Sequence, residues 1–120
     1  MKKVSLLAAL FLFSMIAVAH ADAKRGEEIY NTKSKGRCAV CHKFGKKLVG
    51  PDLTGVTGRA TEKWIKKWLA DPKKVWNEND PYMVDLKKRM KKMKRKKPSH
   101  KTPPLTADMI DDLIDFLKTK

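Results

Sequence analysis

The chain has 120 residues, of which 42% are hydrophobic and 34% are charged. Its 28 lysines and arginines outnumber the 13 acidic residues, which gives a formal net charge of +15 at pH 7. This length excludes a multidomain architecture. A chain of this size buries only about 60–65% of its unfolded surface, so its core is marginal unless something else completes it.

The N-terminus has the layout of a secretory signal peptide. A basic start precedes an uncharged apolar run at residues 4–19, and small residues follow at alternate positions around Ala21. The run falls short of the about 20 residues that span a bilayer, which favours a cleaved signal over a membrane anchor. We expect cleavage after Ala21, with Ala23 as the alternative, so that residues 22–120 form a single domain. Because the segment has no lipobox-type cysteine, the bacterial periplasm is the expected location.

The positive charge remains after this cleavage. Residues 1–21 contain Lys2, Lys3 and no carboxylate, so 26 basic residues face 13 acidic ones and the net charge is +13. Such a charge concerns partners and solubility rather than fold. Nucleic acid is not an expected partner of an exported protein. An acidic protein surface is expected, or a peripheral contact with an anionic membrane.

Both cysteines lie in the motif Cys-Ala-Val-Cys-His at residues 38–42. The pattern Cys-x-x-Cys-His is the attachment signature of c-type haem. Each thiol adds to one vinyl group of the haem, one helical turn spans the two groups, and the histidine ring projects at the iron. Cys38 and Cys41 are therefore the expected covalent links to one haem c, and His42 is the expected proximal ligand.

Other uses of the two thiols are weaker hypotheses. A disulfide between residues three apart would be strained and would constrain little of the unfolded chain. A structural zinc site takes four ligands, usually from two such pairs, and the chain has no third cysteine. A redox-active dithiol requires a strand and a helix around it, and strand patterns are scarce here.

Helices are expected on both sides of this motif. Gly26, Ile29 and Tyr30 share one face of a first short helix. The Gly- and Pro-rich residues 44–60 are expected to form turns. Thr61 is a plausible N-cap for a helix that carries Trp64 and Trp68 at helical spacing and that ends at Asp71-Pro72. We expect the two tryptophans to line a haem pocket.

A cationic amphipathic helix is expected next. Asp80 can cap it, with Pro81 at its first position. Met83, Leu86, Met90 and Met93 step by three or four residues, so one narrow stripe is apolar. Nine of the eleven residues in the range 87–97 are basic, which is typical of a docking surface or of a solvated face.

The last helix is expected after a Pro-rich loop at residues 98–104. Thr106 is its expected N-cap residue, and Asp108 lies in its first turn, where a carboxylate is favourable. Its apolar side carries Ile110, Leu113 and Phe116. No internal repeat and no convincing strand pattern is present, so the chain is expected to be all-α, with three to five helices.

Taken together, these segments resemble the class I c-type cytochromes, which are small single-haem electron carriers. The resemblance rests on the GEEIY helix, CAVCH, the loop VGPDLTGVTGR and the last helix. It implies a fold of helices wrapped around one covalently attached haem, with Phe116 against Gly26 and the Pro51 carbonyl accepting a hydrogen bond from His42. It also implies a haem pocket that contains Pro51, Leu53, Arg59, Trp64 and Trp68.

The chain departs from this family at the second axial ligand. Members usually supply a methionine, often as Met-Pro, just before the last helix, and this chain has no Met-Pro. His100 lies at that place in the loop and is the first choice as distal ligand. Met93 is the alternative, and an open iron position is a third option. Two imidazoles would favour ferric iron and lower the reduction potential, whereas methionine raises it.

The sequence therefore predicts a periplasmic electron-transfer protein of low potential that is not an enzyme. Its basic face at Lys87–Lys97, with Lys43, Lys46 and Lys47 near the haem motif, would dock an acidic redox partner. A haem-based ligand-binding or sensing protein is the alternative if the sixth position is free. A haem subunit of an obligate complex is a second alternative.

Overall fold

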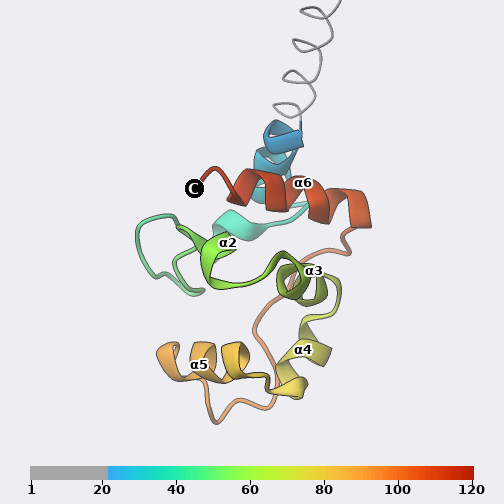
Figure 1. Ribbon diagram of the computed structural model, residues 1–120. Helices are drawn as coiled ribbons and strands as arrows, with labels where there is room; N and C mark the ends of the chain where they lie inside the picture. Colours follow the sequence, from blue (N-terminus) through green and yellow to red (C-terminus); the bar gives the residue numbers. More distant parts are fainter. Residues whose placement is uncertain (1–21) are drawn as a thin grey trace, which may run out of the picture.

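A computed structural model describes residues 22–120, and the expected signal peptide lies outside the described residues. Residues 22–31 are helical. The 3-10 helix η1 (Cys38–Val40) and five α-helices follow: α2 (Val56–Arg59), α3 (Glu62–Ala70), α4 (Pro72–Glu78), α5 (Pro81–Arg89) and α6 (Ala107–Leu117). No strand is present among residues 22–120 (Figure 1), which confirms the all-α class. No helix in this range is both long and apolar enough to cross a membrane.

Side-chain caps start four of these helices. The side chains of Thr61, Asp71, Asp80 and Thr106 accept hydrogen bonds from backbone N–H groups in the first turns of α3, α4, α5 and α6. Such caps satisfy donors that have no partner within the helix. The expected caps Thr61, Asp80 and Thr106 are thereby confirmed. The helices α2 and α4 were not expected from the sequence, although Asp71-Pro72 starts α4 as Asp80-Pro81 starts α5.

The first helix and α6 cross at Gly26. A Cβ at this glycine would lie 2.0 Å from the Asp112 carbonyl oxygen and 2.7 Å from Phe116 Cβ. Close to the crossing, the Tyr30 and Phe116 rings are 5.4 Å apart and buried. The expected pairing of Phe116 with Gly26 is therefore present, and Figure 1 shows the first helix beside α6.

Two further groups of buried side chains lie around α3. On one side, Ile65 packs against Ile110 and Ile114 of α6. Val75, Trp76 and Met83 of α4 and α5 form a separate cluster, against which Trp64 and Trp68 of α3 pack. Figure 1 shows α3 between α6 and the α4–α5 pair. The tryptophans of α3 thus lie where the two halves of the molecule meet.

The cationic helix is shorter than its sequence predicts. It ends at Arg89, because Lys91 takes a left-handed backbone conformation with φ 55°. The Lys91 and Lys92 N–H groups donate to the Lys88 and Lys87 carbonyls, which is the Schellman arrangement of a helix C-terminus. No glycine marks this stop in the sequence. As a result, Met93 lies outside the apolar stripe and is 52% exposed.

Replacing Gly26 with alanine should destabilise the protein by about 1–3 kcal/mol, the usual cost of inserting a methyl group into a packed contact. The added Cβ cannot avoid the Asp112 backbone. Denaturant unfolding of the purified protein measures the effect. Gly58→Ala is the matched control, because a Cβ at Gly58 meets no atom within 4 Å. Equal unfolding midpoints for the two variants would contradict the crossing described above.

Candidate functional site

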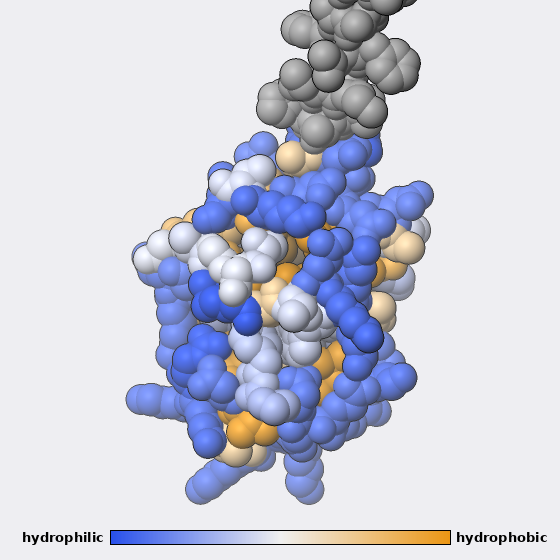
Figure 2. All heavy atoms as spheres, in the orientation of Figure 1, coloured by the Kyte–Doolittle hydropathy of each residue, from blue (hydrophilic) through white to orange (hydrophobic). Residues whose placement is uncertain are grey.

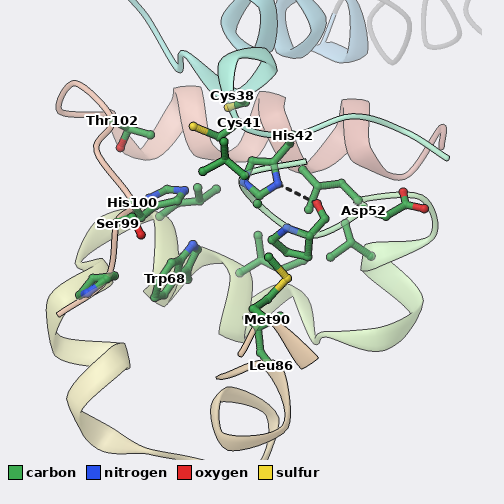
Figure 3. Close-up of a pocket in the computed structure, with 18 of the residues that line it drawn as sticks. Cys38, Cys41, His42, Asp52, Trp68, Leu86, Met90, Ser99, His100 and Thr102 are labelled. Atoms are coloured by element: carbon green, nitrogen blue, oxygen red, sulfur yellow. Dashed lines mark hydrogen bonds between the residues drawn. The ribbon is translucent and has the colours of Figure 1, made fainter. Parts of the chain in front are cut away.

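Almost all of the site residues predicted from the sequence line one cavity. It lies between the segment after η1, helix α3, the end of α5 and the loop at residues 98–102 (Figure 3). Figure 2 shows hydrophobic side chains in the hollow between hydrophilic residues that cover most of this face. The predicted residues that line the cavity are Cys38, Cys41, His42, Pro51, Leu53, Arg59, Trp64, Trp68 and His100. Met93 does not line it.

A tight turn brings the motif residues together. The N–H groups of Cys41 and His42 both donate to the Cys38 carbonyl, at 3.1 and 3.0 Å. This turn directs both thiols and the imidazole to the cavity, as Figure 3 shows. The two cysteines are not joined by a disulfide. Burial raises the pKa of the Cys38 thiol to about 11, so this thiol is uncharged at neutral pH.

His42 is held by the loop that follows it. Its Nδ1 lies 2.9 Å from the Pro51 carbonyl oxygen, which is the hydrogen bond that the resemblance implies. A carbonyl oxygen only accepts, so Nδ1 carries the proton and Nε2 keeps its lone pair. Gly50 allows this approach, because a Cβ there would lie 2.3 Å from the ring. Burial lowers the pKa of His42, which favours the neutral form that binds metals.

His100 faces His42 within the cavity. The centres of the His42 and His100 rings are 6.3 Å apart. The Trp68 ring also lies beside His100, with 5.0 Å between the two ring centres. Nδ1 of His100 is buried, and it has no hydrogen-bond partner within the part of the chain that the structure describes. Burial lowers the pKa of His100 to about 4, and electrostatic repulsion between the two histidines is the second, smaller cause. A neutral imidazole with a buried nitrogen that lacks a hydrogen-bond partner is destabilising unless that nitrogen binds something.

The methionine that lines the cavity is not the one that the sequence predicts. Met93, the alternative distal ligand, is exposed and lies away from the cavity because α5 ends before it. Met90 lines the cavity instead, although the sequence favoured an ordinary core role for it. Figure 3 shows Met90 and His100 reaching the cavity from different segments of the chain.

The remaining predicted residues form the walls. Trp64 and Trp68 stack with ring centres 5.8 Å apart, and the Trp64 indole N–H donates to Asp80 at 2.9 Å. The Arg59 guanidinium donates to the carbonyls of Thr54 and Asp52, which keeps the loop after Pro51 in place. These walls are largely apolar.

Sequence reasoning missed Trp76 and Lys87, which also line the cavity. Trp76 belongs to α4, and its indole N–H donates to the Arg95 carbonyl. The Asp71-Pro72 pair was the signal that could have revealed α4. The sequence places Lys87 in the basic face at Lys87–Lys97, and no sequence signal distinguishes it from its lysine neighbours.

The donor set suits a large apolar group with a metal at its centre better than a bare ion. No cluster of three or more His, Cys, Asp or Glu side chains that could hold a metal ion occurs within residues 22–120. Two free thiols and two half-buried imidazoles around an apolar cavity fit haem, which needs thioether links and axial nitrogen ligands. The orphaned Nδ1 of His100 and the glycine at position 50 are consistent with this fit.

Comparisons with known proteins agree with this description. The cytochrome c family model matches residues 23–120. Over 46 residues, the chain is 52% identical to the cytochrome c-type cyt cy of Rhodobacter capsulatus; this match covers 38% of the chain and only 21% of that relative.

Solved structures share the fold. Cytochrome c from Rhodothermus marinus superposes with a TM-score of 0.60 at 21% identity, over 83% of this chain and 77% of that one. An engineered form of it gives a TM-score of 0.66 at 22% identity, over the same shares of the two chains. Because the family model spans nearly all of the described residues, the chain belongs to the cytochrome c family, and its cofactor is covalently attached haem c.

Proposed function

We propose that this cytochrome c is a periplasmic, single-haem carrier of low reduction potential that transfers one electron at a time and transforms no substrate. Electron transfer itself follows from the family. The finer assignment rests on one observation, which is that His42 and His100 face each other across the cavity with ring centres 6.3 Å apart.

Three residues of the motif at 38–42 would hold the haem. Cys38 and Cys41 would carry the thioether links, and His42 would bind the iron through Nε2. The haem supplies an iron that alternates between ferrous and ferric states. The Pro51 carbonyl orients the His42 ring and keeps its proton on Nδ1, which leaves Nε2 free to bind. Leu53, with the stacked tryptophans of α3, would keep water from the site.

His100 is the proposed distal ligand. Two imidazoles that bind one metal from opposite sides, each at about 2.0–2.1 Å, have ring centres about 6 Å apart. The observed separation agrees with this estimate. Coordination would also give the half-buried His100 ring a partner; its buried Nδ1 has no hydrogen-bond partner among residues 22–120. Met90 is the competing ligand, because its side chain lines the same cavity.

The distal ligand decides the redox character. A methionine thioether raises the potential of a haem, so its replacement by an imidazole lowers it. If His100 binds the iron, it occupies the sixth position. A sensing function is then disfavoured, because it would require that position to be free or easily vacated. No observation favours an open site, and carbon monoxide binding in the experiment below distinguishes the two functions.

An acidic redox protein is the proposed partner. The basic segment beyond Lys87 is largely exposed, and Lys92 reaches the Val49 carbonyl at 3.4 Å, so this segment lies beside the loop that follows the haem motif. Val49 and Met93 are exposed there among the lysines. Clustered charge of one sign attracts the opposite charge and speeds encounter. Contact with an anionic membrane is the alternative use of the same surface.

Replacing both Cys38 and Cys41 with alanine should abolish covalent haem attachment, because the chain has no other cysteine. Either single replacement should leave one thioether. Mass spectrometry of protein exported from cells competent for cytochrome maturation measures the bound haem. A double variant that still carried covalent haem would overturn the proposed attachment.

Replacing His100 with alanine should change the visible spectrum of the ferric protein and allow the ferrous protein to bind carbon monoxide. The unmodified protein should refuse carbon monoxide and lack the weak ferric absorption band that marks sulfur ligation. Met93→Leu is the control and should leave the spectrum unchanged, because Met93 is exposed. If Met90→Leu altered the spectrum and His100→Ala did not, Met90 would be the ligand.

Electron exchange with hexacyanoferrate, an anionic probe, should slow as salt rises from about 10 mM, because screening shortens the range of exposed charges. The double variant Lys94→Gln/Lys96→Gln should show a slower rate at low salt and a weaker salt dependence. Lys24→Gln/Lys33→Gln, on and just after the first helix, is the charge-matched control. Identical rates and salt dependences for the two double variants would contradict the proposal that the basic segment beyond Lys87 is the docking surface.

A further inference from the structure

Lys87 is buried, although it belongs to a run of exposed basic residues. Its side chain and backbone together are 6% exposed, and the structure buries no other charged residue in the range 22–120 to this degree. Its Nζ donates to the Trp76 carbonyl at 2.8 Å and to the Asn79 side-chain oxygen at 2.5 Å. The ammonium also lies 4.3 Å from the centre of the Trp76 ring.

The charge of this ammonium is not neutralised. Both hydrogen-bond acceptors are uncharged, and no carboxylate within the described residues forms an ion pair with Lys87. Its neighbours show the contrast, because Arg89 pairs with Asp85 and Lys67 pairs with Glu78. A buried charge without a counter-ion is costly to maintain.

A structural role accounts for only part of this arrangement. The Trp76 carbonyl lies in the last turn of α4, where a cation is favourable, and Asn79 ends this helix in a left-handed conformation with φ 50°. Lys87 therefore caps α4 from a neighbouring helix. Lys87 and Trp76 also both line the cavity, which capping α4 alone does not require.

We propose that the Lys87 ammonium raises the reduction potential of the haem and partly offsets the lowering by the second imidazole. This inference rests on the proposed function, in which the cavity holds the haem. A haem held in this cavity would gain one electron from a donor protein and lose it to an acceptor, and the Lys87 side chain would stay in place beside it. Because reduction removes one positive charge from the site, a fixed neighbouring cation favours the ferrous state.

Burial makes this effect stronger than that of the surface lysines. Exposed charges more than about a Debye length away are screened by salt, whereas buried charges are screened much less. Nine basic residues occupy the range 87–97, yet only Lys87 among them is buried. Arg89 and Lys92 of this run also line the cavity, but Arg89 is exposed and paired with Asp85, and Lys92 is only half-buried. Lys87 is therefore the buried cation of the run, and it has no carboxylate partner among residues 22–120.

Potentials of three variants, measured by spectroelectrochemistry on haem-loaded protein, test the proposal. Lys87→Met should shift the equilibrium constant towards the ferric state by about tenfold, which is 59 mV for a one-electron couple. Lys87→Arg should retain the original potential, because the charge remains. Lys88→Met, which removes an exposed charge one residue away, should change the constant by less than about twofold. An unchanged potential in Lys87→Met would overturn the proposal.

Asn79→Asp provides the test if Lys87→Met fails to fold. Aspartate has the same shape, tolerates the left-handed conformation and would pair with the ammonium, so it should also lower the potential. Asn77→Asp adds the same charge at an exposed position of α4 and is the control. Equal shifts in these two variants would overturn the role of Lys87. Failure of the unmodified protein to carry covalent haem, seen by mass spectrometry, would instead overturn the proposed function.

Discussion

The hydrogen bond between His42 and the Pro51 carbonyl is the contact on which the rest of the site depends. It determines which nitrogen of His42 carries the proton, and it ties the haem motif to the loop that forms one wall of the cavity. Gly50 permits the approach, and Arg59 holds the carbonyls just beyond Pro51. A ligand ring oriented in this way needs no rearrangement when it binds a metal.

The cavity also explains how so short a chain can be stable. Its buried side chains form clusters on two sides of α3, one with the first helix and α6 and the other with α4 and α5. Trp64 and Trp68 lie between them. A small domain gains little from its own core, so a large apolar cofactor bound in this cavity would supply packing that the chain cannot supply alone.

Basic residues that are neighbours in the sequence differ in how deeply they are buried. Lys87 and most of the basic residues after it have different environments, because α5 turns Lys87 inward, whereas most basic residues beyond its C-terminal Schellman motif are exposed. Exposed cations act on partners at a distance and are sensitive to salt. A buried cation such as Lys87, which lines the cavity with Trp76, would act on a group bound there and would be screened much less by salt.

The sequence by itself determined the all-α class, the haem motif and most helix starts, because these depend on residues close together in the chain: Cys38 to His42 in one turn, and Thr61, Asp80 or Thr106 capping the next few N–H groups. The pocket residues and His100 could be named through the resemblance. Only the tertiary structure decided that Met93 is exposed, that Met90 and Trp76 line the cavity, and that Lys87 is buried. These outcomes depend on where α5 ends and on how α4 packs, and no local pattern encodes contacts between side chains distant in the sequence.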